Sequence, residues 1–413
     1  MDTPAIHTES RPASLLFRHR DFRRLWTGET ISVFGSRMGS VALSFAAVIA
    51  IRATPIQIGL LAAVQLVPKL LFSLVAGVWV DRARRRPLMI CGDLGRCALL
   101  VTIPLAASFG KLRMSFLYPL ILVVGVLDLL FEVAYGAYLP SLVDAADIVE
   151  ANSKLSASYA AAEIGGFAIA GCLVQRLTAP YAILIDALSF VASALAISSI
   201  RKPEAVVATG SKRRYFYREA LAGARMVAVN RRLSVLVRAE ALAAFSYATF
   251  STLYMLFVVR TLGFAPGALG LIFAIGGVSS FFSSFVATRF VERFGEGRML
   301  ASGLMLQGIS AICVPAARGA AALAASLLII HQVFGDAGGT VAIIMGTAIP
   351  QTLVPGQMLG RVRSAISFAV LAALIAGSLS AGLTAELVGP RPVMFAGAMG
   401  MAAAGGLFAQ SAP

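Results

Sequence analysis

Ionisable side chains inside long apolar stretches are the residues of this sequence that could do chemistry. A charged group in such a stretch is costly unless it lines a water-filled cavity or finds a partner, so each one is a functional candidate. Carboxylates there can take up and release protons, and basic groups can pair with them. We expect a proton-coupling and translocation cavity formed by Glu29, Arg37, Lys69, Asp128, Glu132, Glu163 and Asp336.

Asp128 and Glu132 form the most informative pair of carboxylates. They lie four residues apart and share one face of a helix, with Tyr135 about one turn further along. Two carboxylates so close in a low-dielectric cavity cannot both ionise easily, which is what a proton-coupling site needs. The alternative interpretation is structural, with each carboxylate permanently paired to Arg37 or Lys69.

The remaining ionisable residues of the apolar stretches are expected to have structural roles. Asp186 opens the predicted sixth span near the outer face, where the favoured interpretation is a helix N-cap. A histidine can titrate near neutral pH, but a lone one such as His331 is more often a hydrogen-bonded residue of a helix bundle. Residues near predicted span ends can pair or reach the interface; these are Asp93, Arg96, Arg238, Glu240 and Glu386.

The elements that must position these residues are membrane-spanning helices. Of the 413 residues, 58% are hydrophobic and only 13% are charged, about half the charge of a soluble domain, which excludes a soluble enzyme or a secreted scaffold. A helix that spans a bilayer needs about 20 apolar residues. Twelve stretches qualify: roughly 25–51, 56–80, 87–109, 115–139, 155–175, 181–200, 235–259, 266–290, 299–316, 320–349, 365–388 and 392–410.

The basic residues predict the orientation of these spans. The chain has 35 Lys and Arg against 20 Asp and Glu, a net charge of +15. With a cytoplasmic N-terminus, 24 of the 35 lie in cytoplasmic segments, seven in the opposite loops and four inside spans, which is the positive-inside bias. The excess therefore indicates orientation rather than nucleic-acid binding, and both termini are expected in the cytoplasm.

The chain divides into two six-span halves. We expect a cytoplasmic tail at 1–24 without a cleaved signal peptide, an N-terminal half at 25–200, a cytoplasmic loop at 201–233 and a C-terminal half at 234–413. At an offset of 211 residues, Pro55 and Gly59 align with Pro266 and Gly270. Two parallel repeats with a site between them are typical of secondary transporters. Basic clusters in the central loop could bind anionic lipids, although a solvated loop is the simpler interpretation.

Other kinds of chemistry are not indicated. The four cysteines lie in apolar runs without metal-ligand or redox spacing, so we interpret them as packing residues. No glycine-rich run has the Lys-Ser/Thr ending of a nucleotide site. No nucleophile with a base and no metal-spaced cluster stands out, so the sequence predicts neither an enzyme nor a bound cofactor or metal.

The segment Gly77–Arg86 introduces a resemblance to a known family. Glycine, three residues, Asp-Arg and then basic residues resemble the loop between the second and third helices of major facilitator superfamily transporters. The resemblance covers nearly the whole chain, and within the superfamily it is similar to the branch of macrolide-efflux and siderophore-exporter permeases. It also rests on the segments 22–26, 93–96, 139–143, 151–153, 351–355 and 360–362.

The resemblance implies roles for two groups of residues. In the family, the loop is a cytoplasmic gating latch that holds one conformation, a role that falls here on Gly77, Asp81, Arg82, Arg85 and Arg86. Arg84 stands where the family often has glycine, so the turn should be less tight. In the fifth span, small residues permit close helix packing, and they replace a Gly-Pro motif of family exporters: Gly165, Gly166 and Gly171.

These observations predict an all-α membrane protein of twelve helices with the major facilitator fold. The expected function is proton-coupled efflux of a small amphiphilic compound, such as a drug, siderophore or secondary metabolite, by alternating access. Proton-coupled uptake of a nutrient or siderophore is the alternative within transporters, and a non-transporting membrane sensor or assembly partner is the alternative of another class. The expected partners are the substrate, protons and the bilayer of a bacterial inner membrane. Nucleic acid is not expected as a partner, and the protein is expected to be a monomer.

Overall fold

The computed structural model describes residues 14–80, 82–204 and 216–411, and this part of the chain is built of helices. Twelve stretches of it are long and apolar enough to cross a membrane, which confirms the number of predicted spans. The helices are α1 Leu15–Arg18, α2 Arg20–Phe45, α3 Pro55–Val80, α4 Arg85–Ser108, α5 Met114–Leu142, α6 Ile148–Leu177, α7 Ala179–Ser198, α8 Phe216–Val229, α9 Arg231–Leu256, α10 Pro266–Phe294, α11 Glu296–Ala311, α12 Cys313–Ala316, α13 Ala321–Leu353, α14 Gly356–Val388 and α15 Pro390–Ser411.

The two halves repeat each other at one constant offset. Helices α2 and α9 begin 211 residues apart, and both continue into a five-residue π-helical segment, Ala46–Ala50 and Phe257–Thr261, at the same spacing. The starts of α3 and α10, the ends of α5 and α13, and the ends of α6 and α14 also match at 211. The repeat predicted from a few matched residues therefore extends over the whole six-helix unit.

Two predicted boundaries differ in the structure. Helix α2 begins at Arg20 and is preceded by the short helix α1, so part of the predicted tail is helical. The predicted central loop contains α8, which packs against α14 and α9. Hydrophobicity alone did not reveal α8, because only one face of this short helix is apolar.

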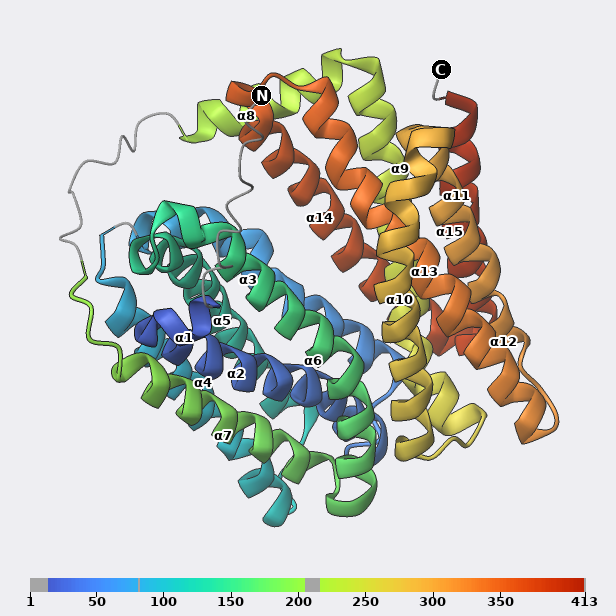
Figure 1. The fold of residues 1–413 in the computed structure, drawn as a ribbon. Helices are drawn as coiled ribbons and strands as arrows, with labels where there is room; N and C mark the ends of the chain where they lie inside the picture. The colour runs from blue at the N-terminus through green and yellow to red at the C-terminus, as the bar shows by residue number, and fades with distance from the viewer. Residues whose placement is uncertain (1–13, 81, 205–215, 412–413) are drawn as a thin grey trace, which may run out of the picture.

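Each half is a bundle with the same internal packing. Helix α2 packs against α6 and α7, as α9 packs against α14 and α15, and α4 packs against α5 and α7, as α11 packs against α13 and α15. Figure 1 shows the N-terminal bundle, blue to green, beside the C-terminal bundle, yellow-green to red. Between the bundles, α6 packs against α10 and α3 packs against α14, so the second and fifth spans of each half form the interface.

The bundles meet at one end. We call the end where α2 begins and α15 ends the termini side, and the opposite end the far side. Three hydrogen bonds join the halves on the far side: Arg260 Nη2 to the Val48 carbonyl at 2.8 Å, the Gly267 amide to Gln175 Oε1 at 2.8 Å, and the Ile56 amide to Glu386 Oε2 at 3.4 Å.

Small residues allow this close approach of the two halves on the far side. Gly171 of α6 lies against the backbone of Pro266 and Gly270 in α10, and Gly59 of α3 lies against Gly382 of α14. A side chain at any of these glycines would meet backbone atoms of the other half.

Candidate functional site

A cavity of about 1020 Å³ lies between the two halves. The N-terminal half contributes Ser40 and Ser44 of α2 with Glu163 and Phe167 of α6, and the C-terminal half supplies most of the wall from α9, α10, α11, α13 and α14. Pockets of about 300–1,000 Å³ hold drug-sized ligands. The cavity is therefore large enough for a small organic molecule.

The cavity extends toward the termini side. Its wall includes Leu300, Pro350 and Arg363, each within two helical turns of the termini-side end of its helix. Toward the far side the wall includes Tyr254 and Phe273, beyond which the halves are in contact. The arrangement is thus closed on the far side and reaches toward the termini side.

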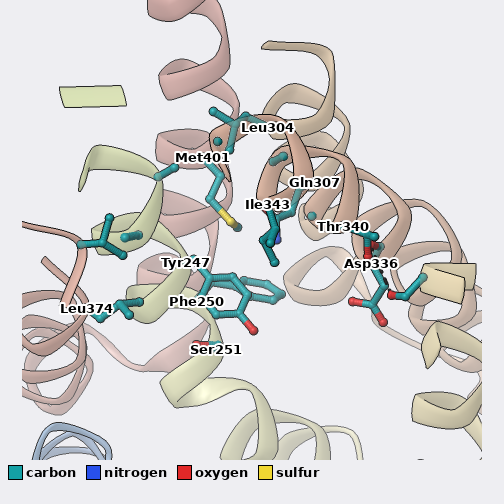
Figure 2. Close-up of a pocket in the computed structure, with 18 of the residues that line it drawn as sticks. Tyr247, Phe250, Ser251, Leu304, Gln307, Asp336, Thr340, Ile343, Leu374 and Met401 are labelled. Carbon is teal, nitrogen blue, oxygen red and sulfur yellow. Dashed lines mark hydrogen bonds between the residues drawn. The ribbon is translucent and has the colours of Figure 1, made fainter. Parts of the chain in front are cut away.

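The wall combines aromatic rings with a few polar groups. Figure 2 shows Asp336 and Thr340 of α13 on one side and Tyr247, Phe250 and Leu374 on the other. Apolar walls with a small number of placed polar groups orient amphiphilic ligands.

Asp336 of α13 is one of three carboxylates that line the cavity, with Glu163 and Glu240. Its Oδ2 accepts a hydrogen bond from Gln332 Nε2 at 3.3 Å, and the charged group that acts on it electrostatically is another carboxylate, Glu163. Among the residues that the structure describes, no basic side chain forms an ion pair with Asp336. An unpaired carboxylate at mid-membrane depth can bind a proton or a cationic group.

Glu163 and Arg37 form an ion pair at the edge of the cavity. Arg37 Nε of α2 lies 3.0 Å from Glu163 Oε2 of α6, and both side chains are partly exposed. The glycines Gly165 and Gly166 place α6 close to α2 here, because they lie against Phe34 and Arg37. Glu163 and Asp336 are the two predicted cavity residues that line it.

Lys69 and Glu132 lie together in the N-terminal half, between α3 and α5. Lys69 Nζ is 2.9 Å from Glu132 Oε2, and both side chains are half exposed. Glu132 thus has the lysine partner of the structural interpretation, whereas its predicted companion Asp128 pairs with Arg96 at 2.7 Å. Asp128 and Glu132 therefore belong to two different ion pairs and share no cation.

We expect the pair of Lys69 and Glu132 to contribute little to stability. Partly exposed ion pairs are worth about 0–1 kcal/mol, so the double variant Lys69→Gln/Glu132→Gln should change the free energy of unfolding by less than about 1 kcal/mol. Unfolding in mixed micelles followed by circular dichroism measures this. The single variants are the control, because each leaves one charge without its partner; a double variant less stable than both would contradict the expectation.

Glu29 lies apart from the cavity. It is buried, and its Oε1 accepts a hydrogen bond from the Tyr159 hydroxyl at 2.7 Å. Its other oxygen is without a hydrogen-bond partner among the described residues. Arg37, which the sequence assigned to the same cavity as Glu29, pairs instead with Glu163.

Three residues that the sequence placed at span ends are buried in the bundle instead, which corrects the prediction. Asp93 and Arg96 of α4 have exposures of 0% and 3% and form an ion pair with each other. Asp186 is buried at 5% exposure in the body of α7, where it lies against Gly35 and Gly39 of α2, and it is not an N-cap. The apolar stretches begin before these residues, so their distance from the predicted ends was underestimated.

His331 is packed among aromatic rings. Its ring centroid lies 5.2 Å from that of Phe250 and 5.9 Å from that of Tyr254, and its exposure is 7%. Its Nδ1 is without a hydrogen-bond partner among the described residues, so it is packed rather than hydrogen bonded there.

Cavity residues that the sequence did not assign to a cavity include Glu240, Gln307 and Arg363. Glu240 and Arg363 carry charges near helix ends, which their position explained without a cavity. Gln307 is uncharged and gave no signal in a sequence searched for ionisable groups.

The predicted latch loop binds helix ends within the N-terminal half. Arg85 Nη1 donates to the Ala137 carbonyl of α5 at 3.0 Å, and Arg86 Nε donates to the Ile197 carbonyl of α7 at 3.1 Å. The carboxylate of Glu204 accepts the amides of Arg85 and Arg86 at the start of α4. A carboxylate at a helix N-terminus and guanidinium groups at C-termini both complement the helix dipole.

The other latch residues are less informative. Gly77 lies in α3 with open space around it, and Arg82 is exposed, whereas Asp81 lies outside the described residues. Arg84 has φ of −67°, whereas Gly295 in the equivalent position of the C-terminal half has φ of +80°. The first loop therefore lacks the positive-φ residue of the second. The gating role of the loop stays a prediction.

Comparisons with known proteins agree with this architecture. A family model described as "Transmembrane secretion effector" matches residues 13–412. The uncharacterized MFS-type transporter YfiS of Bacillus subtilis (strain 168) is 24% identical over 386 residues, which cover 91% of this chain and 89% of the relative.

Solved structures of bacterial transporters share the fold. The bacterial homologue of the iron transporter ferroportin in its inward-facing state superimposes with a TM-score of 0.76 at 17% identity, over 95% of this chain and 99% of the other. The outward-facing state of such a homologue superimposes with a TM-score of 0.58 at 16% identity and the same coverage. The fold of this chain is therefore shared with these structures.

Proposed function

The chain belongs to the major facilitator superfamily, in its family of transmembrane secretion effectors, and we propose that this membrane transporter exports a small amphiphilic compound in exchange for protons. The observation that carries the proposal is the cavity of about 1020 Å³ between the halves, with the carboxylate of Asp336 in its wall. A cavity open toward one side at a time is the requirement for alternating access.

The charge distribution supports an orientation in which the cavity faces the cytoplasm. The positive-inside bias favours a termini side that faces the cytoplasm of a bacterial inner membrane, and the cavity extends toward that side. A substrate then enters from the cytoplasm or the inner leaflet. Separation of α3 from α14 and of α6 from α10 on the far side would release it outside.

The cavity lining supports the substrate class. Tyr247, Phe250 and Phe273 offer ring faces and edges to an apolar body, while Gln307 and Asp336 offer polar groups to its heteroatoms. Aromatic rings bury large apolar areas, and an unpaired carboxylate attracts a cationic or hydrogen-bonding group. Both features together favour amphiphilic molecules over sugars or inorganic ions.

Asp336 is the residue at which substrate and proton would compete. A protonated Asp336 has no charge for the substrate to neutralise, and an ionised one is costly until a cation or a proton arrives. Binding of one therefore disfavours the other, which is the condition for exchange transport.

We expect Asp336→Asn to abolish proton-driven transport while substrate exchange continues. The amide keeps the shape and hydrogen-bonding capacity of the side chain but cannot bind or release a proton. Uphill transport driven by a pH gradient in everted membrane vesicles should fall at least about tenfold, equivalent to about 1.4 kcal/mol. Exchange of labelled for unlabelled probe across proteoliposomes without a gradient should continue for an uncharged probe, which does not need the ionised carboxylate, and should weaken for a cationic one.

The probes for this measurement are ethidium, a macrolide and a catecholate siderophore. Asp144→Asn is the control, because Asp144 is an exposed aspartate outside the spans. If wild-type vesicles move no protons with any transported probe, proton-coupled export is wrong. If Asp336→Asn transports uphill at the wild-type rate, the coupling role of Asp336 is wrong.

A further inference from the structure

The N-terminal half contains a second group of buried charges, outside the cavity. We call Glu29, Asp93, Asp128 and Asp186, with Arg96 among them, the acid cluster. Arg96 Nη1 lies 2.7 Å from Asp128 Oδ1, and Arg96 Nη2 bonds to Asp93 Oδ1. Glu29 and Asp186 lie within electrostatic range of Arg96. The cluster joins helices α2, α4, α5 and α7.

Arg96 is held in place by aromatic rings as well as carboxylates. Its guanidinium carbon lies 4.5 Å from the ring centroid of Phe131 and 4.1 Å from that of Phe190. A guanidinium between two ring faces gains cation–π attraction and loses conformational freedom. Its single positive charge is therefore fixed between Asp93 and Asp128.

Four carboxylates share this one fixed cation. The neighbouring basic residues are engaged elsewhere, Arg37 with Glu163 and Lys69 with Glu132. The other titratable groups that face the cluster are the hydroxyls of Tyr135 and Tyr159, of which Tyr159 donates to Glu29. If all four carboxylates were ionised, the cluster would carry a net charge of −3 in the middle of the membrane.

Three of these carboxylates each have one oxygen that is buried and unpartnered. These are Glu29 Oε2, Asp93 Oδ2 and Asp186 Oδ1, within the part of the chain that the structure describes. An unpaired anionic oxygen away from water is expensive. Protonation removes the charge, so the cheapest state of the cluster holds protons on some of these groups.

We propose that the acid cluster is a proton-binding site separate from the cavity. The cluster holds protons among Asp186, Asp93 and Glu29, and it exchanges them with water through Asp128. The side chain of Asp128 is 49% exposed, whereas Asp93 is fully buried, so Asp128 is the member of the cluster that lies at the surface of the bundle. A proton taken up by Asp128 cancels its charge and weakens its bond to Arg96. Arg96 then stays with Asp93, and the contact between α4 and α5 loosens.

The binding of protons can be tested without any substrate. Infrared absorption distinguishes the carbonyl stretch of a protonated carboxyl group from that of a carboxylate. The measurement uses the full chain in lipid bilayers at neutral pH, with aspartate labelled by ¹³C at its side-chain carboxyl carbon. The Asp336→Asn variant serves as background, so that the cavity aspartate does not contribute to the spectrum.

We expect a protonated carboxyl band in this background, part of which shifts on labelling and therefore comes from aspartate. Adding Asp186→Asn should remove part of the shifted band, and Asp144→Asn should leave it intact. Transfer to deuterium oxide should shift the band of the background variant, and Asp128→Asn should slow that shift. If Asp186→Asn does not fold, the labelled band of the Asp336→Asn background alone still shows whether aspartates of the protein hold protons.

The proposal is overturned if no aspartate-derived protonated band exists at neutral pH, if Asp186→Asn leaves the band unchanged, or if Asp128→Asn leaves the exchange rate unchanged. The role of these protons in transport rests on the proposed function, but their binding does not. If wild-type vesicles show no proton flux but the protonated carboxyl band is present, only proton-coupled export is contradicted. Absence of the band with proton flux retained would contradict the acid cluster alone.

Discussion

Replacing Arg96 with glutamine is expected to destabilise the protein by about 3–5 kcal/mol, the usual cost of removing one partner of a buried ion pair. Asp93 and Asp128 would lose the cation that both contact, and Asp93 is fully buried. The rings of Phe131 and Phe190 would also lose the guanidinium between them. The free energy of unfolding in mixed micelles, followed by circular dichroism, measures the effect.

Two companion variants separate charge from packing in this experiment. Arg289→Gln removes an arginine that is exposed in α10 and should change stability by less than about 0.5 kcal/mol. Adding Asp93→Asn to Arg96→Gln removes the stranded carboxylate and should recover part of the loss. A loss below about 1 kcal/mol for Arg96→Gln would show that the pair is not the electrostatic centre of the bundle.

The fold was predictable because its signals are long and repeated. Twelve apolar stretches follow from the thickness of a bilayer, and the 211-residue offset followed from Pro55 and Pro266, which begin equivalent helices in the two halves. Proline at a helix start marks an element boundary more sharply than hydrophobicity does. The helix α8 was not predicted, because a short amphipathic helix carries neither signal.

The candidate site was predictable only in part, because a sequence shows which charges lie in spans but not which ones meet. Their spacing along one helix predicted that Asp128 and Glu132 act as a pair. In the structure, α5 packs against two different helices, so Asp128 pairs with Arg96 of α4 and Glu132 pairs with Lys69 of α3. Ion-pair partners on other helices depend on tertiary packing, which residue spacing along one helix does not predict.

Depth in the membrane was the second limit. Asp93, Arg96 and Asp186 lie near apparent span ends in the sequence, yet they are buried at the centre of the N-terminal bundle. Helices α4 and α7 are packed on several sides, so a charged group on them is shielded from lipid by protein rather than by distance from the membrane surface. Among the predicted cavity residues, Glu163 and Asp336 line the cavity, whereas Glu29 and Asp128 belong to the acid cluster.

The separation of these two regions has a mechanical consequence. The cavity is mainly a property of the C-terminal half and the acid cluster of the N-terminal half. Coupling between protons bound in the acid cluster and substrate bound in the cavity must then pass through the helices that touch both regions, which are α2 and α6. Movement of α6 is limited on the far side by its contact with α10, so that contact should control the transport cycle.

Gly171→Val is therefore expected to open the far side. Gly171 of α6 lies against the backbone of Pro266 and Gly270, so an added side chain has no flexible neighbour that can move away. Overpacking costs about 1–3 kcal/mol, and this cost falls on the closed far side alone. The equilibrium should shift by about 5- to 150-fold toward the state in which the halves separate there.

Spin labels at positions 176 and 387, exposed far-side ends of α6 and α14, measure the separation in a variant whose four native cysteines are replaced. The distance distribution should move to longer values in Gly171→Val and less so in Gly171→Ala. Gly136→Val is the matched control, because Gly136 is a helical glycine of the same half with open space around it. If Gly171→Val keeps the wild-type distribution, the contact of α6 with α10 does not close the far side, and closure must depend on α3 and α14.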